Sequence, residues 1–301
     1  MDVDIKPGTY VVAVSGGVDS MVLLDVLAKN PDVKLTVAHF DHGIRVDSKQ
    51  DRELVQKTAK NYKLPFVYHE GKLGPGTSEA LARTARYAFL RRVQQAANAQ
   101  AVITAHHQDD VLETAILNVL RGTGRKGLTS LQNHQGLVRP LLRTPKQALI
   151  DYALANGLTW HEDSTNQDTA YKRNHIRRNL IPRFTSSEKQ TVLSELNELA
   201  KINADLDRLL MNHLHMQPAH DVLDRHWFIM LPHNASLELM ATWLRQHNIR
   251  GFDSKLLERL TVAGKVLPAG KKVDIDSNHH LIIEKTKLAL VVRTDGRLSQ
   301  K

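Results

Sequence analysis

Cysteine is absent from this chain of 301 residues. Its absence excludes disulfides, zinc–thiolate sites, iron–sulfur clusters held by thiolates and any catalytic thiol. Aromatic residues are also sparse, at 5 %. No apolar run approaches the length that spans a membrane, and no signal peptide is evident at the N-terminus. We therefore expect a cytoplasmic protein without a membrane segment.

Basic residues are in excess. Lys and Arg number 41 against 32 Asp and Glu, which gives a formal net charge of +9. Such an excess is typical either of a solvated basic surface or of a protein that binds a polyanion. Apolar residues make up 42 % of the chain, enough for packed cores, and its length exceeds the usual size of one core. The composition thus predicts two domains.

Short apolar segments alternate with longer helical patterns in the first part of the chain. They predict strands at 10–14, 34–39, 65–69 and 101–105 and helices at 19–29, 47–62, 77–98, 108–120 and 145–156. Strands separated by helices of this length form a parallel, doubly wound α/β sheet with right-handed crossovers. In such a sheet, ligands bind beyond the carboxyl ends of the strands.

The pattern changes near residue 185. A long amphipathic helix at 186–214 carries a leucine stripe, which indicates burial in a core or a contact in a homodimer. Two further helices and three short strands follow, at 236–249, 253–263, 271–275, 280–284 and 289–292. We therefore predict a catalytic domain at 1–185, a linker helix at 186–215 and a small α+β domain at 216–301.

The most informative segment is Ser15-Gly16-Gly17-Val18-Asp19-Ser20, which joins a predicted buried strand to a predicted helix. Backbone N–H groups at a helix N-terminus bind anions, and glycine lets a phosphate approach the backbone closely. Asp19 beside a polyphosphate would be repulsive without a divalent cation, so the segment implies Mg²⁺. An ordinary strand-to-helix turn is the alternative; the Walker pattern G-x-x-x-x-G-K-[ST] does not occur.

A second polar cluster, His106-His107-Gln108-Asp109-Asp110-Val111-Leu112-Glu113-Thr114, follows the strand predicted at 101–105. Asp110 and Glu113 share one helix face. An N-terminal capping role explains one aspartate but not the whole cluster, and neither the His-x₃-His nor the H-E-x-x-H spacing of zinc sites is present. Asp41 and His42 follow another predicted strand, where a solvated turn is the alternative to a site.

Two basic segments contain no acid. Arg121 to Lys146 has six Lys or Arg residues, and Tyr171 to Arg183 has five. A solvated face would explain either segment alone, but two of them flanking the polar cluster favour contact with a phosphate backbone.

Several motifs carry a resemblance to a known family. Residues 15–20 resemble the pyrophosphatase loop of the PP-loop ATP-pyrophosphatase superfamily, and 106–114 resemble the HHxDDxxET signature of its tRNA(Ile)-lysidine synthase branch. Further segments resemble that branch in the same order, at 38–45, 79–87, 121–124, 139–142, 162–166 and 173–177. The resemblance extends from about residue 10 to 185. Longer members of the family carry a further C-terminal domain.

The resemblance implies an adenine nucleotide α-hydrolase-like fold and an ATP-dependent ligase. In that family ATP adenylates the C2 oxygen of the wobble cytidine in CAU-anticodon tRNA(Ile), and the ε-amine of L-lysine displaces AMP to give lysidine. The implied ATP site is Ser15 to Ser20, with Mg²⁺ on Asp19 and Asp109 and lysine on Asp110 and Glu113. The implied catalytic residues are Asp19, Asp41, His106, Asp109 and Arg121, with the choice of base open between His106 and Asp41. The implied tRNA contacts are Arg125, Lys126, Arg173, Arg177, Arg178 and the C-terminal domain, together with Arg83 and Arg86. For Arg83 and Arg86, binding of the α-phosphate and a surface pair that supports the sheet are the alternatives.

Three other functions are compatible with parts of this pattern. PP-loop enzymes that add sulfur to tRNA generally depend on cysteine, which this chain lacks. PP-loop ligases that act on a small molecule do not need the two acid-free basic segments. A non-catalytic tRNA-binding protein would not need both polar motifs intact.

Overall fold

The computed structural model describes residues 1, 3–43, 48–71, 73–74, 76–161, 172–217 and 219–293. Contacts along the chain divide it into two compact units, Met1–Leu199 and Ala200–Lys301. The division falls within helix α8 (Ser186–His215). None of the helices in the described ranges combines the length and the apolar character needed to cross a membrane.

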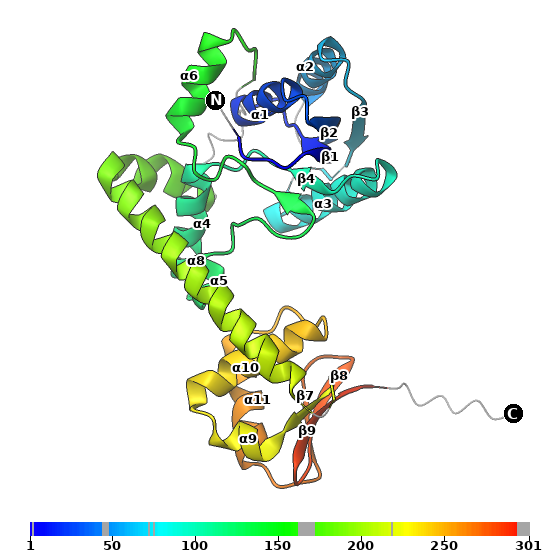
Figure 1. Ribbon diagram of the computed structural model, residues 1–301, viewed down its shortest axis with the longest axis vertical. Helices are drawn as coiled ribbons and strands as arrows, with labels where there is room; N and C mark the ends of the chain where they lie inside the picture. Colours follow the sequence, from blue (N-terminus) through cyan, green and yellow to red (C-terminus); the bar gives the residue numbers. More distant parts are fainter. Residues whose placement is uncertain are drawn as a thin grey trace, which may run out of the picture. The chain divides into compact units, whose positions relative to one another are not determined.

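The first unit is built on a sheet of five parallel strands in the order β3-β2-β1-β4-β5 (Figure 1). The strands are β1 (Gly8–Ala13), β2 (Val33–Asp41), β3 (Phe66–Glu70), β4 (Ala101–Ile103) and β5 (Leu137–Val138). The predicted parallel α/β sheet is confirmed. The two-residue strand β5 was not predicted, because two residues are too few to show any periodicity.

Helices cover both faces of this sheet. Val12, Val37 and Ile103 belong to the core on one face, where they are joined by residues of α1 (Val18–Ala28), α2 (Ser48–Asn61) and α6 (Lys146–Ala155). The alternate positions Val11, Ala38 and Val102 face the other side, toward α3 (Glu79–Ala96). Successive side chains of a strand point to opposite faces of the sheet. A strand whose residues are all apolar therefore contributes side chains to the core on each face.

A smaller apolar cluster supports α4 (Gln108–Leu120), which α5 (Arg125–Leu128) follows. Leu112 and Leu117 of α4 pack with Ile176, Ile181 and Leu193. These partners come from a π-helical turn η2 (Ile176–Leu180), a 3₁₀ turn η3 (Ile181–Arg183) and the start of α8; the short helix α7 (Lys172–His175) precedes them. The basic segment at 172–183 is thus held against α4.

The strand order sets the position of the site. From β1 the chain proceeds through β2 to β3 on one side, whereas β4 and β5 lie on the other side. The order therefore reverses between β1 and β4, which pair in parallel through Tyr10↔Ala101 to Val12↔Ile103. A crevice forms at such a switch point, beyond the carboxyl ends of the strands. The segments that follow β1 and β4 are the two polar motifs.

The second unit contains an antiparallel sheet in the order β6-β9-β8-β7. Its elements are β6 (Val222–Asp224), α9 (Arg225–Met230), α10 (His233–Gln246), α11 (Ser254–Val266), β7 (Lys271–Asp274), β8 (His279–Ile283) and β9 (Lys287–Val292). Phe228, Trp243 and Leu281 are fully buried in its core. An α+β composition is confirmed; β6 and α9 were not predicted, since both are short.

The leucine stripe of α8, for which burial in a core or a homodimer contact was predicted, is buried only in part. Leu193 and Leu214 are buried, one in each unit. Ile202 and Leu209, at helical spacing between them, are 60 % and 57 % exposed.

A buried carboxylate joins three helices on one face of the sheet. Asp25 of α1 accepts hydrogen bonds from Tyr62, which follows α2, and from Tyr152 of α6 (2.7 Å), and it pairs with Lys29 (2.8 Å). Burial alone would raise the pKa of Asp25, but the bonds from Lys29, Tyr62 and Tyr152 lower it on balance. The charged form therefore stabilises the fold.

Asp25→Ala should lower the free energy of unfolding by about 1–3 kcal/mol, because two tyrosine hydroxyls lose their acceptor. Since the folded pKa of Asp25 is depressed, its contribution is present above the unfolded value of 3.8 and is lost as pH falls through the folded pKa. Urea denaturation at neutral pH measures the effect. Asp151→Ala, at an exposed position of α6, is the control; equal losses in both variants would contradict the role of Asp25.

Candidate functional site

The phosphate-loop motif lies between β1 and α1 and is closed by its own serines. The Ser15 and Gly16 amides donate to Ser20 Oγ at 3.1 and 3.3 Å, and Ser20 Oγ donates to the Gly17 carbonyl at 2.9 Å. Gly17 caps α1 in an extended conformation without a side-chain bond. The loop amides thus converge at a helix N-terminus, where an anion can replace the serine hydroxyl as their acceptor.

Glycine is required at position 16. Its φ is +98°, a conformation that other residues rarely adopt. A Cβ atom there would also lie 3.2 Å from Cβ of Asp51. His161 braces the same turn, since its amide donates to the Gly16 carbonyl at 3.0 Å and its Nδ1 lies 2.8 Å from Asp51 Oδ1. Sequence reasoning did not identify Asp51 or His161, because their link to the loop is entirely tertiary.

The second motif forms the start of α4. His107 is the N-cap: its side chain accepts from the Asp109 amide at 3.3 Å, and the Asp110 carboxylate accepts from the His107 amide at 2.9 Å. This reciprocal capping explains why a histidine and an acid three residues apart begin the helix. Thr104 Oγ1 lies 2.8 Å from Nδ1 of His106 and orients that ring.

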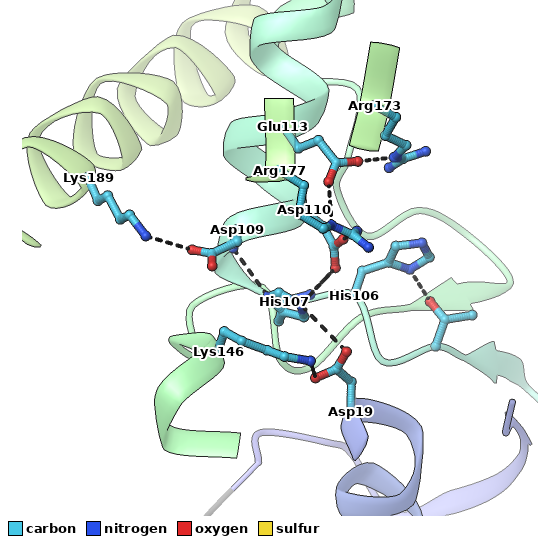
Figure 2. Close-up of polar contacts among 11 residues, drawn as sticks. Asp19, His106, His107, Asp109, Asp110, Glu113, Lys146, Arg173, Arg177 and Lys189 are labelled. Atoms are coloured by element: carbon cyan, nitrogen blue, oxygen red, sulfur yellow. Dashed lines mark hydrogen bonds and ion pairs between the residues drawn. The ribbon is translucent and has the colours of Figure 1, made fainter. Parts of the chain in front are cut away.

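His107 connects the two motifs across the crevice. Its Nε2 lies 3.6 Å from Asp19 Oδ2 and 3.6 Å from Asp110 Oδ2. The structure therefore brings together residues that sequence reasoning placed in one site from two separate segments (Figure 2).

The carboxylates on α4 are matched by arginines of the basic segment at 172–183. Glu113, which is fully buried, accepts from Arg173 and, at 2.9 Å, from Arg177 Nε. Arg177 Nη2 also donates to Asp110 at 3.0 Å. Burial alone would raise the pKa of Asp110, but His107, through its ring and its amide, and Arg177 lower it on balance. Two buried carboxylates are thus paired with two guanidinium groups.

The two aspartates expected to bind Mg²⁺ each have a lysine partner instead. Lys146 Nζ at the start of α6 lies 2.6 Å from Asp19 Oδ1, and Lys189 Nζ in the first turn of α8 lies 3.5 Å from Asp109 Oδ1 (Figure 2). Sequence reasoning missed both lysines. Lys146 was counted in a basic segment, but 127 residues separate it from Asp19.

Carboxylates of this kind fit Mg²⁺, which is usually bound by one or two protein oxygens together with waters and substrate phosphates. The Asp19 and Asp109 side chains are 28 % and 22 % exposed, so their oxygens are accessible. Among the described residues, no group of three or more His, Cys, Asp or Glu could hold a metal ion. The donor set therefore suits a cation that arrives with a polyphosphate.

The remaining expected residues lie outside this network. Asp41 Oδ1 accepts a hydrogen bond from the Gly43 amide at 2.8 Å, which closes a local turn. A turn at this position was the alternative to a functional site in the sequence analysis. Arg121 is exposed at the end of α4, and no contact of its side chain with a described residue is observed. Arg125 and Lys126 lie on α5, and Arg178 is exposed on η2. The motif at 162–166 lies outside the described residues.

His106 has a strongly lowered pKa. Burial is the main cause; Asp110 opposes it, and the positive charges of Arg139, Arg86 and Arg83 add to it, so that the pKa falls to about 3. A histidine side chain ordinarily titrates near neutrality; here a cation cluster lies close to a desolvated ring. In this state His106 is neutral throughout the physiological range.

Between its unfolded pKa of 6.5 and about 3, His106 takes up a proton only in the unfolded chain. Stability should therefore fall as pH drops through this window, and His106→Asn should remove part of that dependence. Urea denaturation of both proteins at about pH 7.5 and about pH 5.5 measures it. Parallel losses in wild type and variant would contradict the lowered pKa.

Comparison with known proteins agrees with the geometry. The sequence model described as PP-loop domain matches residues 3–184. The tRNA(Ile)-lysidine synthase of Francisella tularensis subsp. holarctica (strain OSU18) is 30 % identical over 295 residues, which cover 95 % of this chain and 74 % of that one. The tRNA(Ile)-lysidine synthase of Thermotoga sp. (strain RQ2) is 38 % identical over 189 residues, 59 % of this chain and 46 % of that one.

A solved structure shows the same fold with a different chemistry. The U34-tRNA thiolase NcsA from Methanococcus maripaludis, solved with its [4Fe-4S] cluster, superimposes with a TM-score of 0.52 and 17 % identity over 65 % of this chain and 74 % of that one. This chain has no cysteine and therefore no thiolate that could hold such a cluster. By its PP-loop domain and its relatives, the chain belongs to the tRNA(Ile)-lysidine synthase family.

Proposed function

We propose that this protein is an ATP-dependent ligase that converts the wobble cytidine of CAU-anticodon tRNA(Ile) to lysidine. The observation that supports it most directly is the meeting of the phosphate loop with the His106–Glu113 segment at one switch point, with His107 at 3.6 Å from both Asp19 and Asp110. ATP is held by the loop amides. A cytoplasmic location belongs to the same proposal, because the substrates are found there.

In the first step the C2 oxygen of cytidine attacks the α-phosphorus of ATP, and pyrophosphate leaves. The amides of Ser15 and Gly16 bind the departing pyrophosphate. Asp19 and Asp109 would hold Mg²⁺, which supplies positive charge to the phosphates. Lys146 and Lys189, which pair with these aspartates, would then neutralise phosphate oxygens.

In the second step the ε-amine of lysine attacks C2, and AMP leaves. The carboxylates of Asp110 and Glu113 bind the substrate lysine. Its ammonium group replaces hydrogen bonds that Arg173 and Arg177 donate to these carboxylates in the structure. The amine releases a proton as the C–N bond forms, and either His106 or Asp41 accepts it. Anionic phosphate beside the arginines around His106 would raise its pKa toward a useful range.

The tRNA is bound by the basic surface and by the C-terminal unit in this proposal. Its arginine and lysine contacts come from α3, α5 and the segment at 172–183, at Arg83, Arg86, Arg125, Lys126, Arg173, Arg177 and Arg178. We also propose domain limits at residues 185 and 215. A homodimer is a further part of the proposal, and the exposed part of the α8 leucine stripe is one candidate contact between its subunits.

The decisive experiment supplies ATP, Mg²⁺ and radiolabelled L-lysine to the protein with unmodified CAU tRNA(Ile). We expect lysine to enter this tRNA, with release of AMP and pyrophosphate, and not to enter elongator methionine tRNA with the same anticodon. ATP cleavage to AMP and pyrophosphate without lysine incorporation would support the alternative, a PP-loop enzyme that adenylates another acceptor.

Glu113→Gln should raise the KM for lysine about tenfold or more, because a charge-assisted bond to the substrate is lost. Asp110→Asn should act in the same direction, and ATP binding, measured by calorimetry, should change little in either variant. Glu195→Gln, at an exposed position of α8, is the control. An unchanged lysine KM in both site variants would contradict lysine recognition by these carboxylates.

A further inference from the structure

A groove outside the nucleotide site runs between helix α3 and the edge strand β5. Its volume is about 900 Å³. The wall on α3 includes Arg83, Tyr87 and Arg91, and the opposite wall includes His134 and Arg139. Apolar surface from Val102 and Leu137 forms part of its lining. None of these residues was linked to a groove by sequence reasoning, because its walls come from segments far apart in the chain.

The charge of the groove is of one sign. Among the described residues, its charged lining side chains are all arginines, and none is Asp or Glu. Arg91 is exposed on α3, and no ion pair or hydrogen bond joins it to a described residue. Arg139 is only 4 % exposed, and its Nε has no hydrogen-bond partner among the described residues. A buried donor without an acceptor is costly and points to a ligand that supplies one.

Cations are crowded at one end of the groove. The guanidinium groups of Arg83 and Arg86 lie 4.8 and 5.4 Å from the centre of the Tyr87 ring. Burial lowers the pKa of Arg86 and of Arg139; Tyr87 opposes this shift, and the positive charge of Arg83 adds to it. None of the described residues that line the groove carries a carboxylate. An anion bound there would relieve the repulsion.

The groove leads away from the catalytic crevice. Strands β4 and β5 are parallel, so their carboxyl ends lie on the same side of the sheet as the proposed nucleotide site. Arg139 follows the last residue of β5 and lies at this end, whereas His134 precedes β5 and lies toward the amino ends of the strands. Arg83, Tyr87 and Arg91 follow one another at intervals of four residues along one face of α3, about 6 Å apart along the helix axis. The Thr104 amide, two residues before His106, donates to the Val138 carbonyl at 3.0 Å, which places Arg139 beside the site.

We propose that this groove binds the single-stranded RNA next to the target cytidine. Phosphates contact Arg83, Arg91 and Arg139, and a neighbouring base stacks on the guanidinium and aromatic surface around Tyr87. Single-stranded RNA is recognised in this way, by cations that follow its backbone and by planar side chains under its bases. Amide side chains of Gln95, Asn98 and Gln135 offer hydrogen bonds to base edges. The proposal rests on tRNA being the substrate.

Arg91→Ala tests the groove, with Arg92→Ala as a matched control. Arg92 is the next residue of the same helix and is also exposed, but it lines a different hollow, with Val67 and Phe89. Binding of fluorescently labelled CAU tRNA(Ile) to the full chain is measured by anisotropy over a series of salt concentrations. We expect Arg91→Ala to raise Kd several-fold and to lower the slope of log K against log salt by about one, and Arg92→Ala to match wild type.

A second measurement locates the RNA directly. 4-Thiouridine placed on either side of the target cytidine is photo-crosslinked to the wild-type protein, and the attached peptides are identified. We expect a crosslink to α3 or to residues 134–139. Unchanged tRNA binding in Arg91→Ala, or crosslinks confined to other segments, would overturn the proposal. Lysine incorporation by wild type, measured separately, shows whether the proposed function itself holds, so the two failures are distinguishable.

Discussion

The parallel pairing of β1 with β4 is the constraint on which the site depends. It places the ends of two strands about ninety residues apart in sequence next to one another, at the one point where the order of the sheet reverses. Each end then feeds a helix, and both helices begin at the crevice with their N-termini toward it. The positive ends of α1 and α4 therefore favour anionic ligands before any side chain is considered.

Charge balance is the second feature that organises the site. Four of the five acids expected to act there have a cationic partner in the structure: Lys146 for Asp19, Lys189 for Asp109, Arg177 for Asp110 and two arginines for Glu113. An unpaired buried carboxylate would be strongly unfavourable, so these partners stabilise the charged form of the acids. In the proposed mechanism, Mg²⁺ or the ammonium group of lysine would present positive charge to the same oxygens in their place.

The arginine cluster around Tyr87 has the opposite imbalance. It concentrates positive charge without carboxylates in its groove, and the same charge depresses the pKa of His106. Occupation by phosphate would change both properties together. If the proposed RNA occupies the groove, its phosphates would therefore raise the pKa of His106 through electrostatics.

The sequence by itself determined the local elements. The apolar runs around residues 10–14 and 101–105, the glycines after the first and the His–Asp cluster after the second predicted the parallel sheet and the two motifs, because strand periodicity and helix capping are local effects. Only the tertiary structure decided the partners of those motifs. Lys146, Lys189 and Arg139 have no local sequence pattern that predicts their roles. Folding brings the two lysines next to aspartates that are distant in the sequence. It places Arg139 in a groove whose other charged side chains, among the described residues, are arginines. The two-residue strand β5 is the same case, since pairing with β4 rather than its own sequence creates it.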